Sequence, residues 1–564
     1  MTDINSNDLM SLCKRRGFIW PSFELYGGVA GMYDYGPLGC ALRNNIVEMW
    51  RSIYKGREGF VEIDSETVNP REVLAASGHV ENFADFITYC KQCNAPYRAD
   101  HMVKGFYENP DILTPKELEE AFVKHNIRCP ACGGELGEVG EFNLMFRTNI
   151  GPGSARVGYL RPETAQGIFV NYQNLYRYNR EKLPMGVIQT GRSYRNEIAP
   201  RQGMIRMREF NQMEVELFVD PEDKDWAKFP EIENETLDLI PNTTLELTTM
   251  TVKEAVERGV IANRVLAYFV YTTKQLLTSL GIDAKRLRFR EHEKDEMAHY
   301  AADCWDAEVL LSYGWTEIVG IADRGSWDLS RHAQFSGADL THLKRFDEPR
   351  EMEVEKIAAK HKALGPAFKG KAKAIAAAME SMSPSDVKDG KLAVKVDGEE
   401  ITLTEEYFEV VKRVEKVAGV RVVPHVIEPS HGLDRIFYSV LEHAYDSKDD
   451  YTVLRFAPAV APIKVGIFPL MEKDGLDDKA KEIYEKVHTH RMEAYYDGSG
   501  TIGKRYARMD EVGTPWCITV DYQTLQDGTV TIRDRDTTDQ KRIPADSASA
   551  ILEELLAGRS FSSL

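Results

Sequence analysis

Two neighbouring segments, residues 185–197 and 206–218, restrict the possible folds of this chain most strongly. In the second segment a two-residue period separates polar from apolar side chains, as in a strand with one buried face. The polar face holds Arg206, Arg208, Phe210, Gln212, Glu214 and Glu216, and the apolar face holds Met207, Met213, Val215 and Leu217. Residues 198–205 join the two segments, so we predict an antiparallel pair of strands.

The polar face of this pair has the groups that a nucleotide site needs. The first strand adds Ser193, Arg195 and Glu197 to it. Guanidinium groups bind phosphate oxygens, an aromatic ring stacks on a base, and a carboxylate accepts a hydrogen bond from an amino group. The alternative is a solvated sheet face of ordinary ion pairs. The pattern alone leaves both interpretations open.

Length and composition exclude several classes of protein. The chain has 564 residues, which predicts three or four domains, and 43% hydrophobic residues, which excludes a disordered chain. A net charge of −18 excludes general attraction to nucleic acid, so RNA binding requires local basic patches. Since we find neither a signal peptide nor an apolar run of about 18 residues, we expect a cytoplasmic protein without a membrane partner.

Two CxxC pairs, separated by 35 residues, predict a metal site. They are Cys90, Cys93, Cys129 and Cys132. Four thiolates favour tetrahedral Zn²⁺, and Gly133 and Gly134 permit the tight turn after the second pair. Reduced free cysteines are the alternative, and a nearby histidine is a possible substitute for a thiolate: His79, His101 or His125. We assign the zinc a structural role because the pairs are remote in sequence from the nucleotide motif.

Three segments occur in the order of the signature motifs of class II aminoacyl-tRNA synthetases. Arg195-x-Glu197, a loop, and Arg206 with Phe210 four residues later resemble the second motif. The strand ending at Pro70 resembles the first motif, which builds the dimer interface in that family. Residues 426–444 resemble the third: a strand, then a helix opened by Gly432, with Arg435 outside its apolar stripe.

The finer resemblance is to glycyl-tRNA synthetases of the homodimeric archaeal and eukaryotic type, over nearly the whole chain. The matching segments are residues 26–39, 161–169, 191–216, 317–324, 428–435 and 500–515. The resemblance implies a homodimer that activates glycine with ATP and Mg²⁺ to glycyl-adenylate. It also implies transfer of glycine to the 3′ end of tRNA(Gly).

The resemblance assigns roles toward ATP to named residues. Arg195 holds the α-phosphate, Arg206 and Arg435 meet the γ-phosphate, and these three arginines are the expected catalytic residues. Glu197 takes the adenine amino group, while Phe210 stacks on adenine. Glu317 matches a position near magnesium, and the remaining expected ATP contacts are Asn196, Ile318 and Gly432.

Glycine offers an ammonium, a carboxylate and no side chain, so its site must select by charge and by blocked space. Carboxylates are available for the ammonium at positions that match the family, and Arg98 matches a residue that faces the carboxylate. The expected glycine contacts are Arg98, Glu163, Phe210, Glu214, Glu428, Ser430 and Gly432. Every competitor is larger than glycine, so steric exclusion suffices and we expect no editing domain.

We therefore predict an α+β fold, with a class II antiparallel sheet flanked by helices. The expected parts are catalytic core 1–88, a CxxC insert 89–156, core 157–339, an inserted helical and hairpin subdomain 340–415, core 416–460 and an α/β anticodon-binding domain 461–564. Lysines in the 340–415 insert predict contacts with tRNA phosphates: Lys356, Lys360, Lys362, Lys369, Lys371 and Lys373. Three basic residues of the last domain are further candidates: Lys504, Arg505 and Arg508.

Two other functions compete with this interpretation. A synthetase-like scaffold without catalysis is disfavoured because the five ATP-facing residues are present: Arg195, Glu197, Arg206, Phe210 and Arg435. A threonyl or prolyl enzyme is disfavoured by the acidic set around residues 161–166 and by the Glu428-Pro429-Ser430 triplet.

Overall fold

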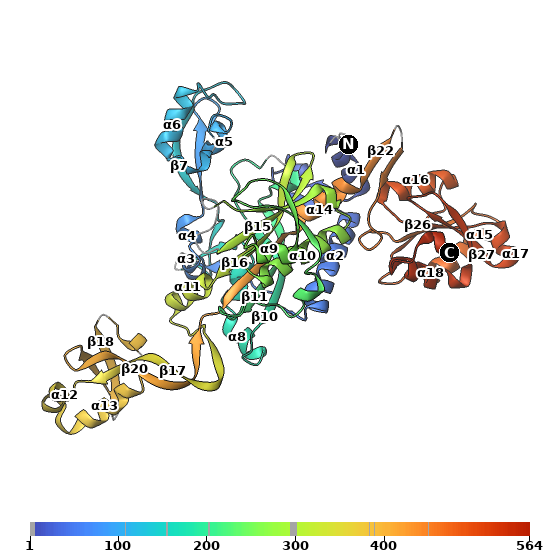
Figure 1. Cartoon of the computed structure of the whole chain (residues 1–564). Coiled ribbons are helices and arrows are strands. Elements are labelled where there is room, and N and C mark those ends of the chain that lie inside the picture. Colours follow the sequence, from blue (N-terminus) through green and yellow to red (C-terminus); the bar gives the residue numbers. More distant parts are fainter. Residues whose placement is uncertain are drawn as a thin grey trace. The chain divides into compact units, whose positions relative to one another are not determined.

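The computed structural model describes residues 6–107, 109–153, 156–200, 203–293, 302–382, 384–388, 390–396, 398–448 and 451–564 (Figure 1). The chain divides into two compact units, one of Met1–Leu340 with Val423–Leu564 and the other of Thr341–Val422.

A nine-stranded sheet forms the centre of the first unit, in the order β13-β12-β14-β15-β16-β21-β11-β10-β3. In chain order the strands are β3 (Val61–Glu62), β10 (Met185–Tyr194), β11 (Glu209–Val219), β12 (Thr236–Ile240), β13 (Thr248–Thr251), β14 (Leu287–Glu291), β15 (Asp303–Leu311), β16 (Gly314–Gly325) and β21 (His425–Gly432). Neighbours are antiparallel except β10 with β3 and β12 with β14. The predicted antiparallel pair is confirmed, with Gln189 opposite Glu214.

The second strand of that pair starts later than predicted. β11 begins at Glu209, and Arg206 lies before it, after the short helix η4 (Gly203–Ile205). The Arg208 backbone N–H donates to the Gly31 carbonyl at 2.9 Å, so the N-terminal segment takes a bond that a longer strand would use. β10 likewise ends at Tyr194, and Arg195 and Glu197 follow it as irregular chain.

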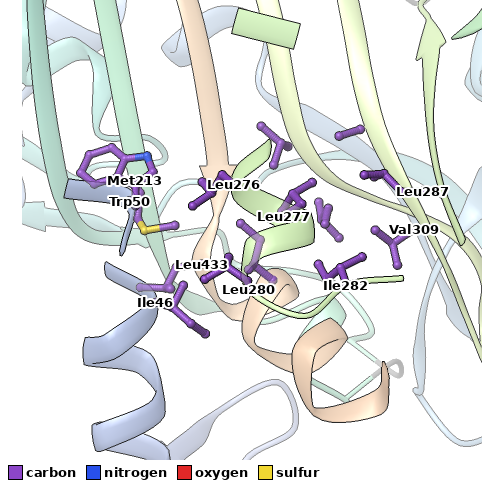
Figure 2. Packing of buried hydrophobic residues seen from close by; sticks show 14 of the residues in the cluster. Ile46, Trp50, Met213, Leu276, Leu277, Leu280, Ile282, Leu287, Val309 and Leu433 are labelled. Carbon is purple, nitrogen blue, oxygen red and sulfur yellow. The ribbon is translucent and has the colours of Figure 1, made fainter. Parts of the chain in front are cut away.

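One face of the sheet packs against helices to form the main core. The helices are α2 (Pro37–Arg51), α10 (Arg264–Ser279) and α14 (Leu433–Ala444). Figure 2 shows Met213 of β11 and Val309 of β15 among side chains of these helices, such as Leu276 and Leu433. The apolar face predicted for β11 is therefore buried, because its two-residue period turns Met213, Val215 and Leu217 toward the helices.

The opposite face of the sheet is divided into an apolar and a polar part. Val187, Phe218 and Val426 pack against the short helices α7 (Ala165–Phe169) and α8 (Tyr172–Tyr178). α7 begins four residues after Arg161. The part of this face that α7 and α8 leave uncovered carries the polar residues of β11 and β21.

The cysteine-bearing segment adds a small sheet in the order β6-β5-β7. It consists of β5 (Ala84–Cys90), β6 (Pro96–Arg98) and β7 (Leu136–Asn143), with α6 (Pro115–Lys124) packed on it. Thr114 begins α6 with a capping box to Glu117.

The C-terminal part of the chain is an α/β domain with its own core. Its sheet has the order β25-β24-β26-β27-β28, formed by β24 (Val465–Pro469), β25 (Ala494–Tyr496), β26 (Trp516–Val520), β27 (Thr529–Asp534) and β28 (Gln540–Pro544). The helices include α15 (Leu476–Val487), α16 (Ile502–Val512) and α18 (Ala548–Leu556).

The second unit is built on a long antiparallel ribbon of β17 (His342–Ala359) and β20 (Phe408–Val422). Two helices, α12 (His361–Phe368) and α13 (Ala372–Glu380), pack with the hairpin of β18 (Lys391–Val396) and β19 (Glu399–Thr404). The unit continues past residue 415, where the sequence analysis ended the insert, because β20 stays paired to Val422 opposite His342. Asp397, between the two strands of the hairpin in the sequence, lies outside the described residues.

Candidate active site

A cavity of about 410 Å³ lies against the polar part of the sheet. It gathers most of the predicted site residues from segments far apart in the sequence. Those among its lining residues are Arg98, Arg195, Glu197, Arg206, Phe210, Glu317, Ile318, Ser430, Gly432 and Arg435. Second-motif and third-motif residues meet here because β11 pairs with β21, which places Gln212 opposite Gly432.

Arg195 is held between two aromatic rings. Its guanidinium carbon lies 5.3 Å from the ring centroid of Phe83 and 5.3 Å from that of Phe210. Its Nε also donates to the Pro162 carbonyl at 3.3 Å. Arg206 lies nearby, with its Nε 3.9 Å from a Glu197 carboxylate oxygen. Both arginines thus line the cavity, Arg195 beside two aromatic rings and Arg206 beside a carboxylate.

Arg435 reaches the same cavity from the first turn of α14, whose N-cap is Gly432. Its guanidinium donates to the carbonyls of Ile205 at 3.1 Å and of Glu317 at 2.8 Å, and it pairs with the Glu317 carboxylate at 3.2 Å. The Arg435 charge lowers the pKa of Glu317. The carboxylate is therefore anionic where it meets the cavity.

Asp434, which the sequence analysis did not select, fixes the end of β11. It is buried, and its carboxylate accepts hydrogen bonds from the Asn211 backbone N–H and side-chain amide and from the Tyr35 hydroxyl. Asn211 follows Phe210, so these bonds position the ring beside Arg195. Tyr35 comes from a segment that no spacing connects to β11, which is why the sequence alone did not identify this arrangement.

A recess of buried carboxylates adjoins the cavity through Ser430, which pairs across the strands with Glu214. Oxygens of Glu214, Glu216 and Glu428 all lie within 4.8 Å of one another. Burial raises the pKa of Glu214, and the nearby Glu163 raises it further. Burial also raises the pKa values of Glu216 and Glu428 well above the usual range, although Arg324 acts against this at both.

Glu163 is the anionic member of the recess. Burial alone raises its pKa, but His79 and Arg324 outweigh that effect and hold the pKa of Glu163 well below its usual range. The His79 Nε2 lies 3.5 Å from the carboxylate, and the Gln166 side-chain amide donates to it at 2.8 Å. The recess therefore combines one carboxylate of lowered pKa with carboxyl groups of raised pKa.

The recess has partners that the sequence analysis missed. Arg324 pairs with Glu428 at 2.7 Å and with Asp328 at 2.8 Å, and Thr164 donates to Glu214 at 2.9 Å. Both lie within the matching segments 161–169 and 317–324, Thr164 next to Glu163 and Arg324 six residues after Ile318. Glu216 is fully buried, and no hydrogen-bond partner of its carboxyl oxygens is found among the described residues.

Arg98 lines the cavity from the end of β6, beside Asp85 of β5. Its guanidinium lies 3.2 Å from the Asp85 carboxylate and 2.5 Å from that of Asp100. Among the predicted residues that do not line the cavity is Asn196, whose backbone N–H donates to the Leu144 carbonyl at 2.6 Å. Glu163, Glu214 and Glu428 belong to the recess instead.

The four predicted cysteines converge at the far end of β5. Their sulfur atoms all lie within 4.8 Å of one another, with Cys90 to Cys132 at 3.4 Å and Cys93 to Cys129 at 3.6 Å. Ligands on one tetrahedral Zn²⁺ at Zn–S distances of about 2.3 Å lie about 3.8 Å apart. The backbone N–H groups of Gln92 and Cys93 point at the Cys90 sulfur, as is favourable for a thiolate. The donor set fits zinc.

The three histidines considered as substitutes have other contacts. His79 approaches Glu163, and His125 stacks on Phe106 with ring centroids 4.5 Å apart. His101 lies 3.8 Å from the Asp100 carboxylate. Among the described residues, the group of potential metal ligands at this place consists of the four cysteines.

Family models match two parts of the chain. Residues 153–444 match the tRNA synthetase class II core domain (G, H, P, S and T), and residues 464–555 match the anticodon binding domain. A glycine–tRNA ligase of Methanothrix thermoacetophila is 52% identical over 97% of this chain and 96% of its own length. One of Methanocaldococcus jannaschii is 48% identical over 97% and 98%. The chain belongs to the glycine–tRNA ligase family.

The fold of this glycine–tRNA ligase family member also resembles a solved structure. Giardia lamblia prolyl-tRNA synthetase in complex with prolyl-adenylate matches 98% of this chain and 79% of its own, with a TM-score of 0.55 and 14% identity. At that identity the likeness concerns the fold alone. It agrees with the predicted class II sheet and C-terminal domain.

One predicted phosphate contact in the C-terminal domain is wrong. Arg505 of α16 is 2% exposed, and its guanidinium donates to the backbone carbonyls of Pro469, Ser499 and Gly500. Arg508 pairs with Asp497 at 2.5 Å, whereas Lys504 is exposed. The helical pattern did not predict the burial of Arg505 because it does not show which neighbouring loop covers a basic side chain.

No helix in the described part of this family member is long and apolar enough to cross a membrane.

Proposed function

We infer that the chain is a glycine–tRNA ligase, which activates glycine with ATP to glycyl-adenylate and transfers it to the 3′ end of tRNA(Gly). One observation carries this conclusion. Three arginines meet in one cavity beside a recess of buried carboxylates, in a chain 52% identical to a glycine–tRNA ligase. Glycine-dependent exchange of pyrophosphate into ATP is the direct test.

In the first step a carboxylate oxygen of glycine attacks the α-phosphorus of ATP, and pyrophosphate leaves. We propose that Arg195 neutralises charge at the α-phosphate, while Arg206 and Arg435 hold the γ-phosphate end. Glu197 and Phe210 bind the adenine base in this proposal, and Asn196, Ile318 and Gly432 are further contacts to ATP. The step needs no acid or base, so catalysis consists of positioning and charge neutralisation.

Glu317 fits a role beside magnesium, because its carboxylate lines the cavity and stays ionised next to Arg435. Oxygen anions are the ligands that Mg²⁺ prefers. When bound, Mg²⁺ supplies neutralisation of phosphate charge.

We propose that glycine binds where the cavity meets the recess. Its ammonium would face Glu163, Glu214 and Glu428, with Ser430 alongside, and Arg98 would face its carboxylate. A methyl group on the substrate would have to displace buried side chains, so larger amino acids are rejected in one step. Phe210 and Gly432 complete the proposed set.

The proposal extends to assembly and location. The strand β4 (Val68–Pro70), which corresponds to the first motif, is the proposed centre of a homodimer interface. We also propose that the enzyme works in the cytoplasm.

We propose that the four cysteines bind one structural Zn²⁺, with a consequence for the cavity. β5 carries Asp85 near one end and Cys90 at the other, and β6 ends at Arg98 five residues after Cys93. Zinc binding contributes a large folding free energy, on the order of 10 kcal/mol in small domains. The metal would therefore hold the two strands that position Arg98.

Cys132→Ser is expected to reduce the zinc content from one to well below one per chain. It should also lower kcat/KM for glycine about 100-fold, because displacement of a substrate contact by about 1 Å has that effect. Elemental analysis and steady-state kinetics measure the two effects. Cys40→Ser is the control, since Cys40 lies outside the cluster and its thiol donates to the Tyr35 backbone carbonyl, a bond that a serine hydroxyl also makes. A native protein with little metal, purified without chelator, would contradict the site.

We propose that the lysines of the second unit contact tRNA phosphates. Lys356 and Lys371 are already paired, with Glu415 at 2.7 Å and Glu399 at 2.5 Å, and the Lys360 ammonium donates to the Glu405 carbonyl at 2.8 Å. Lys362, Lys369 and Lys373 are exposed. Replacing the six predicted lysines with glutamine should raise the tRNA KM and reduce its salt dependence, by a logarithmic slope of roughly 0.7–0.9 per lost contact.

Two partial variants give a sharper test. Replacing only the exposed Lys362, Lys369 and Lys373 should produce most of the rise in tRNA KM. Replacing only the paired Lys356 and Lys371 should produce little of it. Unchanged tRNA KM and salt slope in the six-lysine variant would exclude contact by this unit.

A further inference from the structure

Three side chains of types that bind metals lie together on β15 and just after the end of β14, apart from the cysteine cluster. They are His292, Cys304 and Asp306, and their ligand atoms all lie within 4.8 Å of one another. The His292 Nε2 is 2.8 Å from the Asp306 carboxylate. The proposed reaction assigns no role to any of the three.

Strand register explains why these residues meet. Cys304 and Asp306 are two residues apart on β15 and so share a face, while Trp305 between them is buried in the core. Glu291 of β14 pairs with Trp305, and the next residue continues the ladder, since the His292 backbone N–H donates to the Cys304 carbonyl at 3.0 Å. His292 is thus opposite Cys304, on the face that carries the cavity.

The neighbouring strand leaves room above this group. On β16 the residues opposite Cys304 and Asp306 are Ala322 and Gly320. A Cβ added to Gly320 would lie 3.8 Å from an Asp306 oxygen, so even a methyl would only just touch it. Gly320 also lines the cavity, which makes the group a neighbour of the proposed nucleotide site.

Nearby charges permit a divalent cation. The negative charges of Glu317 and Glu428 help to raise the pKa of the buried Cys304 thiol, and that of Glu317 helps to raise the pKa of the buried Asp306. Arg290 opposes them at 3.7 Å from Asp306, but it also pairs with Glu308 at 3.2 Å. The surroundings are acidic on balance.

We propose that His292, Cys304 and Asp306 form a second metal site, for a divalent transition metal such as Zn²⁺. An imidazole nitrogen, a thiolate and one carboxylate suit zinc or cobalt, whereas Mg²⁺ prefers oxygen ligands alone. Tetrahedral ligands at about 2.0–2.3 Å from zinc lie roughly 3.3–3.8 Å apart, which side-chain rotation brings within reach here. Three protein ligands leave the fourth position open, as in zinc sites that bind water or substrate.

The site has a consequence that rests on the proposed function. A cation at Asp306 would lie beside Gly320 and within the field of Glu317, so it would disturb the phosphate end of ATP. Zn²⁺ beyond one equivalent should therefore slow glycine-dependent pyrophosphate exchange.

The test adds Co²⁺ to full-length protein whose cysteine cluster already holds zinc, because zinc binds more tightly than Co²⁺ and is not displaced. We expect one further equivalent to bind, with a thiolate-to-cobalt charge-transfer band. Cys304→Ser should abolish the band, and His292→Ala should weaken Co²⁺ binding at least about 100-fold, since even residues behind a metal ligand contribute 10–100-fold. Cys40→Ser should retain both signals.

Absence of a saturable second equivalent, or a band that survives Cys304→Ser, would overturn the site. Circular dichroism of each variant separates lost binding from lost folding. Spectroscopic titration requires no catalytic activity, so failure of the proposed function would leave this result intact. Binding without Zn²⁺ inhibition would overturn only the predicted effect on ATP.

Discussion

Arg195→Ala is expected to reduce the rate of glycine-dependent pyrophosphate exchange about 1,000-fold, at the upper end of what a single preorganised donor contributes. Arg195 approaches the cavity between Phe83 and Phe210, and we assign it the α-phosphate. Its charge would be needed most when the α-phosphorus gains a fifth oxygen. The effect should therefore appear mainly in kcat rather than in the KM for ATP.

Arg192→Ala is the matched control, on β10 three residues before Arg195. Its side chain is 59% exposed and pairs with Glu209 at the surface, where an ion pair contributes about 0–1 kcal/mol. Exchange in this variant should stay within a few-fold of the wild type. If Arg195→Ala, with an unchanged melting temperature, behaved like this control, Arg195 would not hold the α-phosphate.

Glu214→Gln should raise the KM for glycine on the order of 100-fold while the KM for ATP changes little. Breaking one side of a buried charge pair costs about 2–5 kcal/mol, and each 1.4 kcal/mol is tenfold. Glu214 is 1% exposed, and glutamine keeps its volume and an acceptor for the Thr164 hydroxyl. Glu209→Gln, at the half-exposed start of the same strand, is the control and should have no comparable effect.

The raised pKa of Glu214 gives this prediction a pH dependence. In the free enzyme the carboxyl group keeps its proton to higher pH than an ordinary glutamate. An ammonium ion binds the ionised form, so glycine affinity should weaken as pH falls and binding should release protons. Calorimetry in buffers of different ionisation enthalpy measures this release. Glycine binding without proton release, or an unchanged KM in Glu214→Gln, would remove Glu214 from the ammonium site.

Strand periodicity and motif order predicted the parts of the site that lie on regular elements. β11 turns Met213 inward and Glu214 toward the recess as its alternation requires, and β21 and α14 bring Gly432 and Arg435 to the same cavity. Arg206 enters from irregular chain, because Arg208 bonds to Gly31. The predicted two-residue period is correct within β11, but the predicted strand begins three residues too early.

Residues supplied by remote segments were not predictable in this way. Phe83 reaches Arg195 from before the cysteine insert, and Tyr35 reaches Asp434 from the N-terminal region. Arg324 pairs with Glu428 across two paired strands. Each contact depends on tertiary packing between segments whose spacing carries no pattern. The burial of Arg505 has the same cause.

Pyrophosphate exchange into ATP, measured with each of the twenty amino acids in the absence of tRNA, tests the central claim most directly. Exchange with glycine alone is the predicted result, because the recess offers carboxylates for an ammonium and the surrounding buried side chains reject any larger substrate. Exchange with a different amino acid would contradict the glycine site. No exchange with any amino acid, from folded protein that still binds ATP, would contradict the assignment of the cavity as a catalytic centre.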